Sequence, residues 1–193
     1  HQYREDGGLC MAYFGDGAAN QGQVYEAFNM AALWNLPAIF VVENNGYAMG
    51  TAVTRGSAET EFHRRGTAFR IPGMKVNGMD VLEVRAAAEI AVAHVRAGKG
   101  PVLMELHTYR YRGHSMSDPA KYRTREEVQE MRENHDPIDA AKAELLKRGV
   151  AEERLKEIEK QIRSIVNESA DFAENSPEPD MAELYTDVLV ESY

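Results

Sequence analysis

Two short apolar runs separated by a helical pattern constrain the fold more than any other feature of this sequence. The first run covers residues 9–14 and the second covers 38–42. Between them, apolar residues recur at helical spacing over 21–35, and Pro37 interrupts the pattern. A strand, a helix and a second strand in so few residues predict a βαβ unit, whose two strands must be parallel.

Polar residues follow both runs directly. Asp16 stands between two glycines after the first run, and Asn44 and Asn45 follow the second. The carboxyl ends of parallel strands share one sheet edge, where ligands of open α/β sheets bind, so we expect Asp16 and Asn45 to converge there. A carboxylate, an amide oxygen and a backbone carbonyl suit Mg²⁺, and the flanking glycines let backbone N–H groups approach a phosphate. Each motif taken alone is equally typical of an ordinary turn.

The alternation of strands and helices continues along the chain. Further strands are expected over 73–78 and 101–106, with a helix between them that Asp80 caps and Gly98 ends. The predicted fold class is therefore α/β, a parallel sheet with flanking helices. Residues 51–72 show no sustained period and are expected to form a long loop whose arginines carry no assigned role.

Helical patterns dominate the last third of the chain. A capping box begins at Thr124, Asp136 precedes a proline, and Gly149 ends the helix that follows it. A long charged helix with one apolar stripe comes next, and a last helix is expected over 181–189. We therefore predict a ligand-binding α/β core over 1–120, its N-terminal part missing, and a helical extension over 121–193 that packs on the core or on a partner subunit.

Composition excludes two classes of partner. The net charge of −9, without clustered Lys and Arg, argues against a nucleic acid. No apolar stretch approaches the roughly 18 residues that would cross a bilayer, so no membrane partner is expected. Cys10, the only cysteine, lies in an apolar run and is expected to be a buried reduced thiol, which suits a cytosolic or matrix compartment.

A third polar loop, over 107–119, follows the strand at 101–106 and is expected at the same sheet edge. In this loop, His114 stands between a glycine and a serine, where an imidazole can contact a phosphate or transfer a proton. Composition alone favours an ordinary exposed histidine.

Longer motifs indicate a family. Twenty-six residues separate GDG (15–17) from NN (44–45), which is the spacing of the thiamine diphosphate motif. The chain resembles the thiamine diphosphate-dependent 2-oxo acid dehydrogenases, the pyruvate dehydrogenase alpha subunits in particular, over essentially its whole length. The matching stretches are GDGAANQGQVYEAFNMAALW, ENNGYAMGT, IPGMKVNGMD, GKGPVLMELHTYRYRGHSMSDPAKYRTREE and SPEPD.

This resemblance implies a role for each matching residue near the first two strands. The side chains of Asp16 and Asn45 and the backbone carbonyl of Tyr47 would bind Mg²⁺. Backbone groups of Gly17 and Ala18 would contact the diphosphate of the cofactor. A Tyr-Arg pair that helps to hold the diphosphate in the family precedes the first residue of this chain, so the site as given is expected to be incomplete.

The resemblance also extends to the third polar loop. His114 would contact the cofactor and assist acyl transfer, and Ser115 matches a serine that is phosphorylated in the mitochondrial relatives. The stretch Ala120-Lys121-Tyr122 stands where those relatives carry a second regulatory serine, and Ala52 stands at the position of a third. This difference favours a bacterial, cytoplasmic protein, with the mitochondrial matrix as the alternative.

The implied function is oxidative decarboxylation of pyruvate, with transfer of the acetyl group to a lipoyl-bearing acyltransferase of a multienzyme complex. In the family, a beta subunit completes an alpha-beta heterotetramer and supplies the glutamate that activates the cofactor. The alternatives are a branched-chain 2-oxo acid or acetoin dehydrogenase alpha subunit, or a non-catalytic assembly module. A nucleotide hydrolase is disfavoured because the sequence lacks G-x-x-x-x-G-K-[ST].

Overall fold

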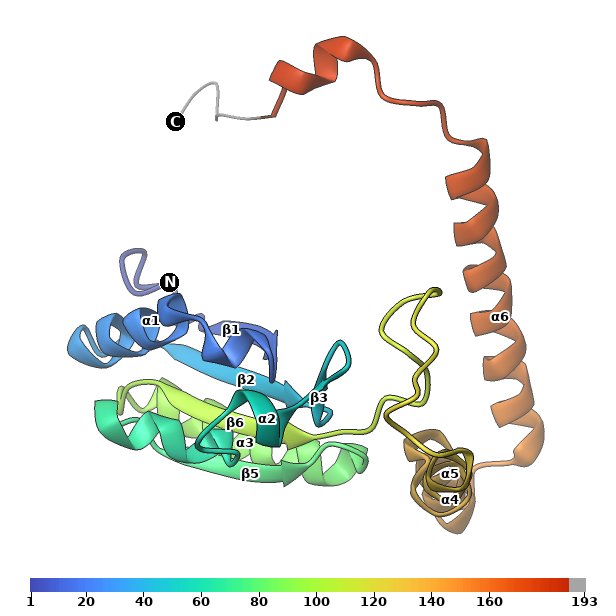
Figure 1. Ribbon diagram of the computed structural model, residues 1–193, viewed down its shortest axis with the longest axis horizontal. Helices are drawn as coiled ribbons and strands as arrows, with labels where there is room; N and C mark the ends of the chain where they lie inside the picture. Colours follow the sequence, from blue (N-terminus) through green and yellow to red (C-terminus); the bar gives the residue numbers. More distant parts are fainter. Residues whose placement is uncertain (188–193) are drawn as a thin grey trace. The chain divides into compact units, whose positions relative to one another are not determined.

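The computed structural model describes residues 1–187, and contacts within the chain define two compact units. The first unit is His1–Ala141, and the second begins at Lys142. This division falls later in the chain than the boundary expected after residue 120. The first unit contains the sheet and the helices that flank it (Figure 1).

The main sheet consists of four parallel strands, as the βαβ pattern predicts. Asp16, Asn45 and Thr108 follow directly after three of these strands, so they lie at one edge of the sheet, here called the carboxyl edge. The α/β class with a parallel sheet is confirmed. In spatial order the strands are β1 (Cys10–Gly15), β2 (Ala38–Asn44), β6 (Val102–His107) and β5 (Gly73–Asn77).

Each face of the sheet has its own apolar core. Helix α3 (Val81–Arg96) covers one face, and α1 (Gly22–Leu33) covers the other together with the 3-10 helix η2 (Phe62–Phe69) (Figure 1). Successive residues of a strand point to opposite faces, so β2 contributes Ile39 to the α3 core and Phe40 to the α1 core. A strand that is buried on both faces reads as a continuous apolar run, which is the pattern seen in the sequence.

Residues 51–72 do not form the long loop that was expected. They contain the strand β4 (Thr51–Ala52), which pairs with β3 (Tyr47–Ala48), then the short helix α2 (Val53–Gly56) and η2. Phe62 is fully buried, and Arg65 Nη1 donates to the Ala19 carbonyl and to the Tyr25 hydroxyl. The prediction was wrong because elements this short, including a 3-10 helix, show no sustained 3.6-residue period.

The expectation of a buried thiol at Cys10 is also wrong, because this side chain is exposed. Strand β1 pairs with β2 only and therefore lies at the side of the sheet. Cys10 lines an open, largely apolar cavity of about 490 Å³ together with Met30, Leu36 and Tyr3. The apolar run therefore predicts the strand correctly, but it does not predict how deeply each of its residues is buried.

The helix-start signals of the last third are confirmed. Helix α4 (Arg125–His135) begins after Thr124, whose Oγ1 accepts a hydrogen bond from the Glu127 N–H at 3.1 Å. Helix α5 (Pro137–Lys147) follows Asp136, whose Oδ1 accepts from the Ile138 N–H at 2.8 Å. Such caps satisfy N–H groups that have no partner inside the helix.

The second unit contains the 24-residue helix α6 (Glu152–Asn175) and the 3-10 helix η3 (Met181–Tyr185). Part of the last helix expected from the sequence, residues 188–189, lies outside the described residues. Over the described part of the chain, none of the helices combines the length and the apolar character that crossing a membrane requires. The remaining element, the 3-10 helix η1 (Ala18–Asn20), belongs to the first unit.

Candidate functional site

The structure brings together the two residues that were predicted to share the carboxyl edge. The Asn45 N–H donates to Asp16 Oδ1 at 3.3 Å. Asp16 is only 2 % exposed, and its second oxygen, Oδ2, is buried without a hydrogen-bond partner. A buried carboxylate oxygen without a partner is costly, so this position favours a cation or a further donor.

The two asparagines in the turn after β2 form different hydrogen bonds. Asn44 is buried, and its Oδ1 accepts from the Gly46 N–H at 3.0 Å, while Asn45 Oδ1 accepts from the Tyr47 N–H at 3.3 Å. Gly46 has a φ of +84°, a conformation that glycine adopts without strain. An amide oxygen has two lone pairs, so Asn45 Oδ1 retains one for a metal ion.

Two arginines that follow β6 in the chain hold the backbone of this turn. Arg123 Nη2 donates to the Asn45 carbonyl at 2.7 Å, and its guanidinium lies over the rings of Tyr47 and Tyr109, 4.9 and 3.8 Å from their centroids. Arg110 Nη1 lies 3.5 Å from the Tyr47 carbonyl, a long hydrogen bond that leaves this carbonyl a second lone pair. The expected metal ligands Asn45 and Tyr47 therefore occupy a supported turn.

Gly17 and Ala18 follow Asp16 directly in the chain. A Cβ at Gly17 would come within 2.6 Å of the Ala48 Cβ on β3, so the close approach of the two segments favours glycine at this position. Gly17 precedes η1, and Ala18 is its first residue. The first N–H groups of a helical turn have no partner within it, which leaves them available to an anion.

A cavity of about 420 Å³ opens beside the turn. Asn45, Tyr47, His107 and Arg123 contribute to its walls, with residues of α2 and of the segment before η2. Among the described residues, Asp16, Gly17, Ala18 and His114 do not line it. The walls consist of Asn44, Asn45, Gly46, Tyr47, Ala52, Val53, Thr54, Thr60, Glu61, His107, Thr108, Tyr109 and Arg123.

His114 and Ser115 lie in an exposed loop. The His114 N–H donates to Asp118 Oδ2 at 2.7 Å, and the hydroxyls of Ser115 and Ser117 lie 3.0 Å apart. Within the described chain, His114 forms no hydrogen bond or ion pair with Asp16 or Asn45, so its predicted contact with the cofactor stays a prediction. A hydrogen bond from the Tyr122 hydroxyl, with those from the His114 and Ala120 amides, lowers the pKa of Asp118 to about 2.

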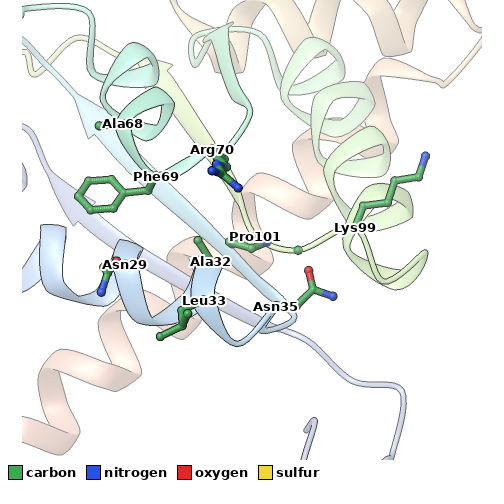
Figure 2. Close-up of a pocket in the computed structure, with 10 residues that line it drawn as sticks. Asn29, Ala32, Leu33, Asn35, Ala68, Phe69, Arg70, Lys99 and Pro101 are labelled. Carbon is green, nitrogen blue, oxygen red and sulfur yellow. The ribbon is translucent and has the colours of Figure 1, made fainter.

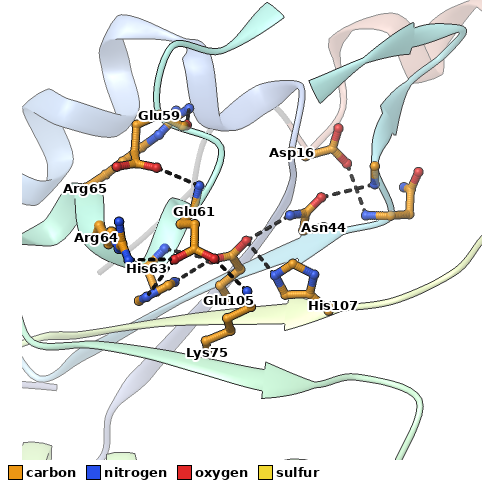
Figure 3. A network of polar contacts seen from close by, with 12 residues as sticks. Asp16, Asn44, Glu59, Glu61, His63, Arg64, Arg65, Lys75, Glu105 and His107 are labelled. Carbon is orange, nitrogen blue, oxygen red and sulfur yellow. Dashed lines mark hydrogen bonds and ion pairs between the residues drawn. The ribbon is translucent and has the colours of Figure 1, made fainter. Parts of the chain in front are cut away.

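Sequence reasoning missed a buried carboxylate next to the site (Figure 3). Glu105 on β6 is fully buried. It accepts hydrogen bonds from Asn44 Nδ2 at 2.8 Å and from the backbone and ring nitrogens of His63 at 2.9 and 2.8 Å. Burial alone would raise the pKa of Glu105, but the bonds from His63 and Asn44 outweigh it and lower the pKa. The available signal was a single charged residue inside the apolar run PVLMEL.

A second cavity lies away from this site, at the opposite edge of the sheet, where β2 and β6 begin (Figure 2). Its volume is about 310 Å³, and its walls include Asn35, Phe69, Arg70, Lys99 and Pro101. Both cationic side chains are exposed. None of the residues predicted to bind the cofactor lines this cavity.

The donor set at the carboxyl edge fits a magnesium diphosphate. Among residues 1–187, no group of three or more His, Cys, Asp and Glu side chains could hold a metal ion. Asp16 could instead combine with amide and carbonyl oxygens, a donor set that suits Mg²⁺, which accepts few protein carboxylates together with phosphate oxygens and water. The unpaired Asp16 Oδ2 beside the Asn45 turn meets this requirement.

The structure defines an α/β domain whose carboxyl edge brings together the Asp16 carboxylate, the Asn45 turn and the start of η1. Comparison with known families identifies the domain further. A family model described as "Dehydrogenase E1 component" matches residues 1–182, so the chain belongs to this family.

Individual relatives are alpha subunits of pyruvate dehydrogenase. The chain is 62 % identical to "Pyruvate dehydrogenase E1 component subunit alpha" of Rhizobium meliloti over 191 residues, which is 98 % of this chain and 55 % of the relative. The Zymomonas mobilis protein of the same name is 62 % identical over 193 residues, 100 % of this chain and 54 % of the relative. The mitochondrial somatic form of this subunit from Bos taurus is 54 % identical over 178 residues, which is 91 % of this chain and 45 % of the relative. The chain therefore spans about half the length of the curated relatives it matches.

Proposed function

We propose that this chain is the Mg²⁺- and thiamine diphosphate-binding part of the alpha subunit of a pyruvate dehydrogenase. The observation that carries the proposal is the buried, unpaired Asp16 Oδ2, held next to the Asn45 turn at the carboxyl edge. High identity to the pyruvate dehydrogenase alpha subunits over nearly the whole chain supports the substrate and favours it over branched-chain 2-oxo acids and acetoin.

The site residues have separate tasks in this proposal. The Asp16 and Asn45 side chains and the Tyr47 carbonyl hold Mg²⁺, while backbone groups of Gly17 and Ala18 contact the diphosphate. Asp16 Oδ1 remains engaged with the Asn45 N–H, so the free Oδ2 is the oxygen that faces the ion. The Arg123 bond to the Asn45 carbonyl keeps the turn from moving when the ion binds.

The exposed loop completes the site. His114 reaches the cofactor when this loop closes, and there it donates a proton or a hydrogen bond during acyl transfer. Ser115 is next to it, so a phosphate at Ser115 would add close to two negative charges beside a diphosphate and disfavour the closed loop.

When bound, thiamine diphosphate would supply the nucleophile for the keto carbon of pyruvate and the electron sink that decarboxylation requires. The residues of this chain bind and orient, and no carboxylate of this chain is assigned the activation of the cofactor. A beta subunit supplies that group. A lipoyl-bearing acyltransferase receives the acetyl group on one sulfur of its disulfide, and the other sulfur is reduced. The proposed compartment is the bacterial cytoplasm, with the mitochondrial matrix as the alternative.

Calorimetric titration tests the proposal. Thiamine diphosphate is titrated, with and without Mg²⁺, into the full-length subunit co-expressed with its beta partner. Saturable binding that requires Mg²⁺ is the expected result. Absence of binding in a folded, assembled protein would contradict the proposal and leave the assembly module as the function.

A further inference from the structure

Glu105 is buried where a charge is expensive, yet it is not part of the candidate cavity. It is fully buried on β6, and it is absent from the described walls of the cavity. Hydrogen bonds from His63 and Asn44 compensate its charge. His107 Nε2 also lies 3.0 Å from Glu105 Oε1 but outside hydrogen-bonding geometry. Buried charges without paired donors are strongly unfavourable, so this arrangement fixes the surrounding groups.

Among these partners, Asn44 leads toward the proposed metal ligands. Its Nδ2 donates to Glu105 Oε1 at 2.8 Å, while its Oδ1 accepts from the Gly46 N–H at 3.0 Å. The Asn44 amide is thus oriented by Glu105 and in turn fixes the turn that carries Asn45. Figure 3 shows Asn44 next to Glu105, with Asp16 near Asn44. At the end of these hydrogen bonds, Asp16 accepts one from the Asn45 N–H.

We propose that Glu105 is a positioning residue for the metal-binding turn, acting through Asn44. The inference rests on the proposed function, because it assigns Glu105 to the support of the same Mg²⁺ site. Glu105 keeps the Asn44 amide in the one orientation that offers its oxygen to Gly46, and so it preorganises Asn45 before the ion arrives. Groups that orient metal ligands in this way typically contribute about 10- to 100-fold to metal affinity.

The hydrogen bonds that lead from Glu105 through Asn44 to Gly46 are here called the relay. The substitution Glu105→Gln tests this relay with little change in side-chain shape. The new amide keeps one oxygen for the His63 N–H, and its NH₂ group then faces Asn44 Nδ2, donor against donor. If the Asn44 amide turns over to resolve this conflict, its NH₂ group faces the Gly46 N–H instead. The relay is therefore interrupted at one end or the other.

A double variant, Glu105→Gln with Asn44→Asp, restores the relay with reversed polarity. The NH₂ group of the amide introduced by Glu105→Gln can donate to one oxygen of the carboxylate introduced by Asn44→Asp, and the other oxygen can accept from Gly46. The net charge of the pair is unchanged. The matched control is Val95→Ala, which removes buried apolar volume from the α3 core without touching the relay.

The experiment uses the full-length subunit assembled with its beta partner. Two quantities are measured: the Mg²⁺ concentration that half-saturates thiamine diphosphate binding, and the hydrogen-exchange rate of the Gly46 amide in the metal-free protein. Circular dichroism and thermal unfolding show that each variant is folded. Glu105→Gln is expected to raise both quantities about tenfold. Val95→Ala lowers thermal stability and changes each by less than about twofold. The double variant returns the Gly46 exchange rate to within about threefold of wild type.

Unchanged Mg²⁺ dependence and unchanged Gly46 exchange in folded Glu105→Gln would overturn the inference and leave the proposed function in place. Equal effects of Val95→Ala and Glu105→Gln would also overturn it, because a general loss of stability would then explain both. Absence of Mg²⁺-dependent binding in the wild-type assembly would overturn the proposed function and this inference together.

Discussion

The two edges of the sheet carry cavities of comparable size that differ in chemistry. The edge where β2 and β6 begin, here called the amino edge, has a cavity of about 310 Å³, and the carboxyl edge has one of about 420 Å³. At the amino edge, Asn35 Nδ2 is paired with the Gly98 carbonyl at 2.8 Å, and the two cations are exposed to solvent. Within residues 1–187, the buried side-chain atoms without a hydrogen-bond partner are Asp16 Oδ2, His107 Nε2 and Arg123 Nε.

These unpaired atoms lie at the carboxyl edge or in the segment that packs on it. The cations at the amino edge are exposed to solvent, whereas the carboxyl edge holds buried polar atoms that form no hydrogen bond within the described chain. Cavity volume therefore does not distinguish the two edges, and unsatisfied buried polar atoms do. A ligand bound at the carboxyl edge would supply the missing partner for Asp16.

Removing the carboxylate of Asp16 should have the largest effect. Asp16→Ala is expected to weaken Mg²⁺-dependent binding of thiamine diphosphate more than about a hundredfold, since outer partners of metal ligands alone contribute about 10- to 100-fold. Calorimetry on the assembled protein measures the loss, and circular dichroism verifies the fold. The exposed Asp6→Ala is the control. Unchanged Mg²⁺-dependent binding in Asp16→Ala would remove the carboxyl edge as the site.

Arg123→Met should have the next largest effect. The substitution keeps much of the apolar stem but removes the bond to the Asn45 carbonyl and the ion pair with Glu127. Hydrogen bonds to charged groups contribute about 1.5–3 kcal/mol, so Mg²⁺ affinity should fall about tenfold. Arg125→Met, at an exposed position two residues further along, should leave the affinity unchanged. Equal results for the two variants would mean that Arg123 does not support the turn.

Acid should release the exposed loop by protonating Asp118. The pKa of Asp118 is lowered to about 2 in the folded protein, so its contribution to stability is complete above its unfolded pKa of about 3.9. The contribution is lost as the pH falls through about 2. An NMR titration of the Asp118 carboxyl carbon should show its midpoint near the lower value, and Asp118→Asn should abolish the accompanying shifts of the His114 and Ala120 amides. A midpoint near 3.9 would show that these hydrogen bonds do not hold the loop.

Neutralising the amino edge should have the smallest effect. Arg70→Gln combined with Lys99→Gln is expected to change thiamine diphosphate affinity by less than about twofold, because distant sites contribute independently. The same calorimetric titration measures this variant. A loss comparable with that of Asp16→Ala would show that the diphosphate binds at the amino edge instead.

Much of the architecture could be predicted because it depends on local patterns. The apolar runs indicated the parallel strands, and the polar residues after them indicated one sheet edge with Asp16 and Asn45 together. The cap at Asp80 follows from its short side chain, whose Oδ1 accepts from the Leu82 and Glu83 amides. Each of these features depends on a few neighbouring residues and a fixed repeat.

The remaining features depend on contacts between distant residues. In the sequence, Glu105 is only a single charged residue within an apolar strand. Its hydrogen-bond partners, His63 and Asn44, are 42 and 61 positions away, so their pairing could not be predicted. His63 itself stands in the segment that was expected to be a loop. Cys10 was expected to be buried because its run is apolar. Its exposure depends instead on which neighbouring elements pack against it. Periodicity carries no information on such pairings.

The most direct test of the proposed site is a crystal structure of the full-length, assembled protein with Mg²⁺ and thiamine diphosphate. We predict an ion about 2.1 Å from Asp16 Oδ2 and from the oxygens of Asn45 and Tyr47, with the diphosphate against Gly17 and Ala18. An ion bound elsewhere, or a diphosphate seated between Arg70 and Lys99 at the amino edge, would contradict this prediction.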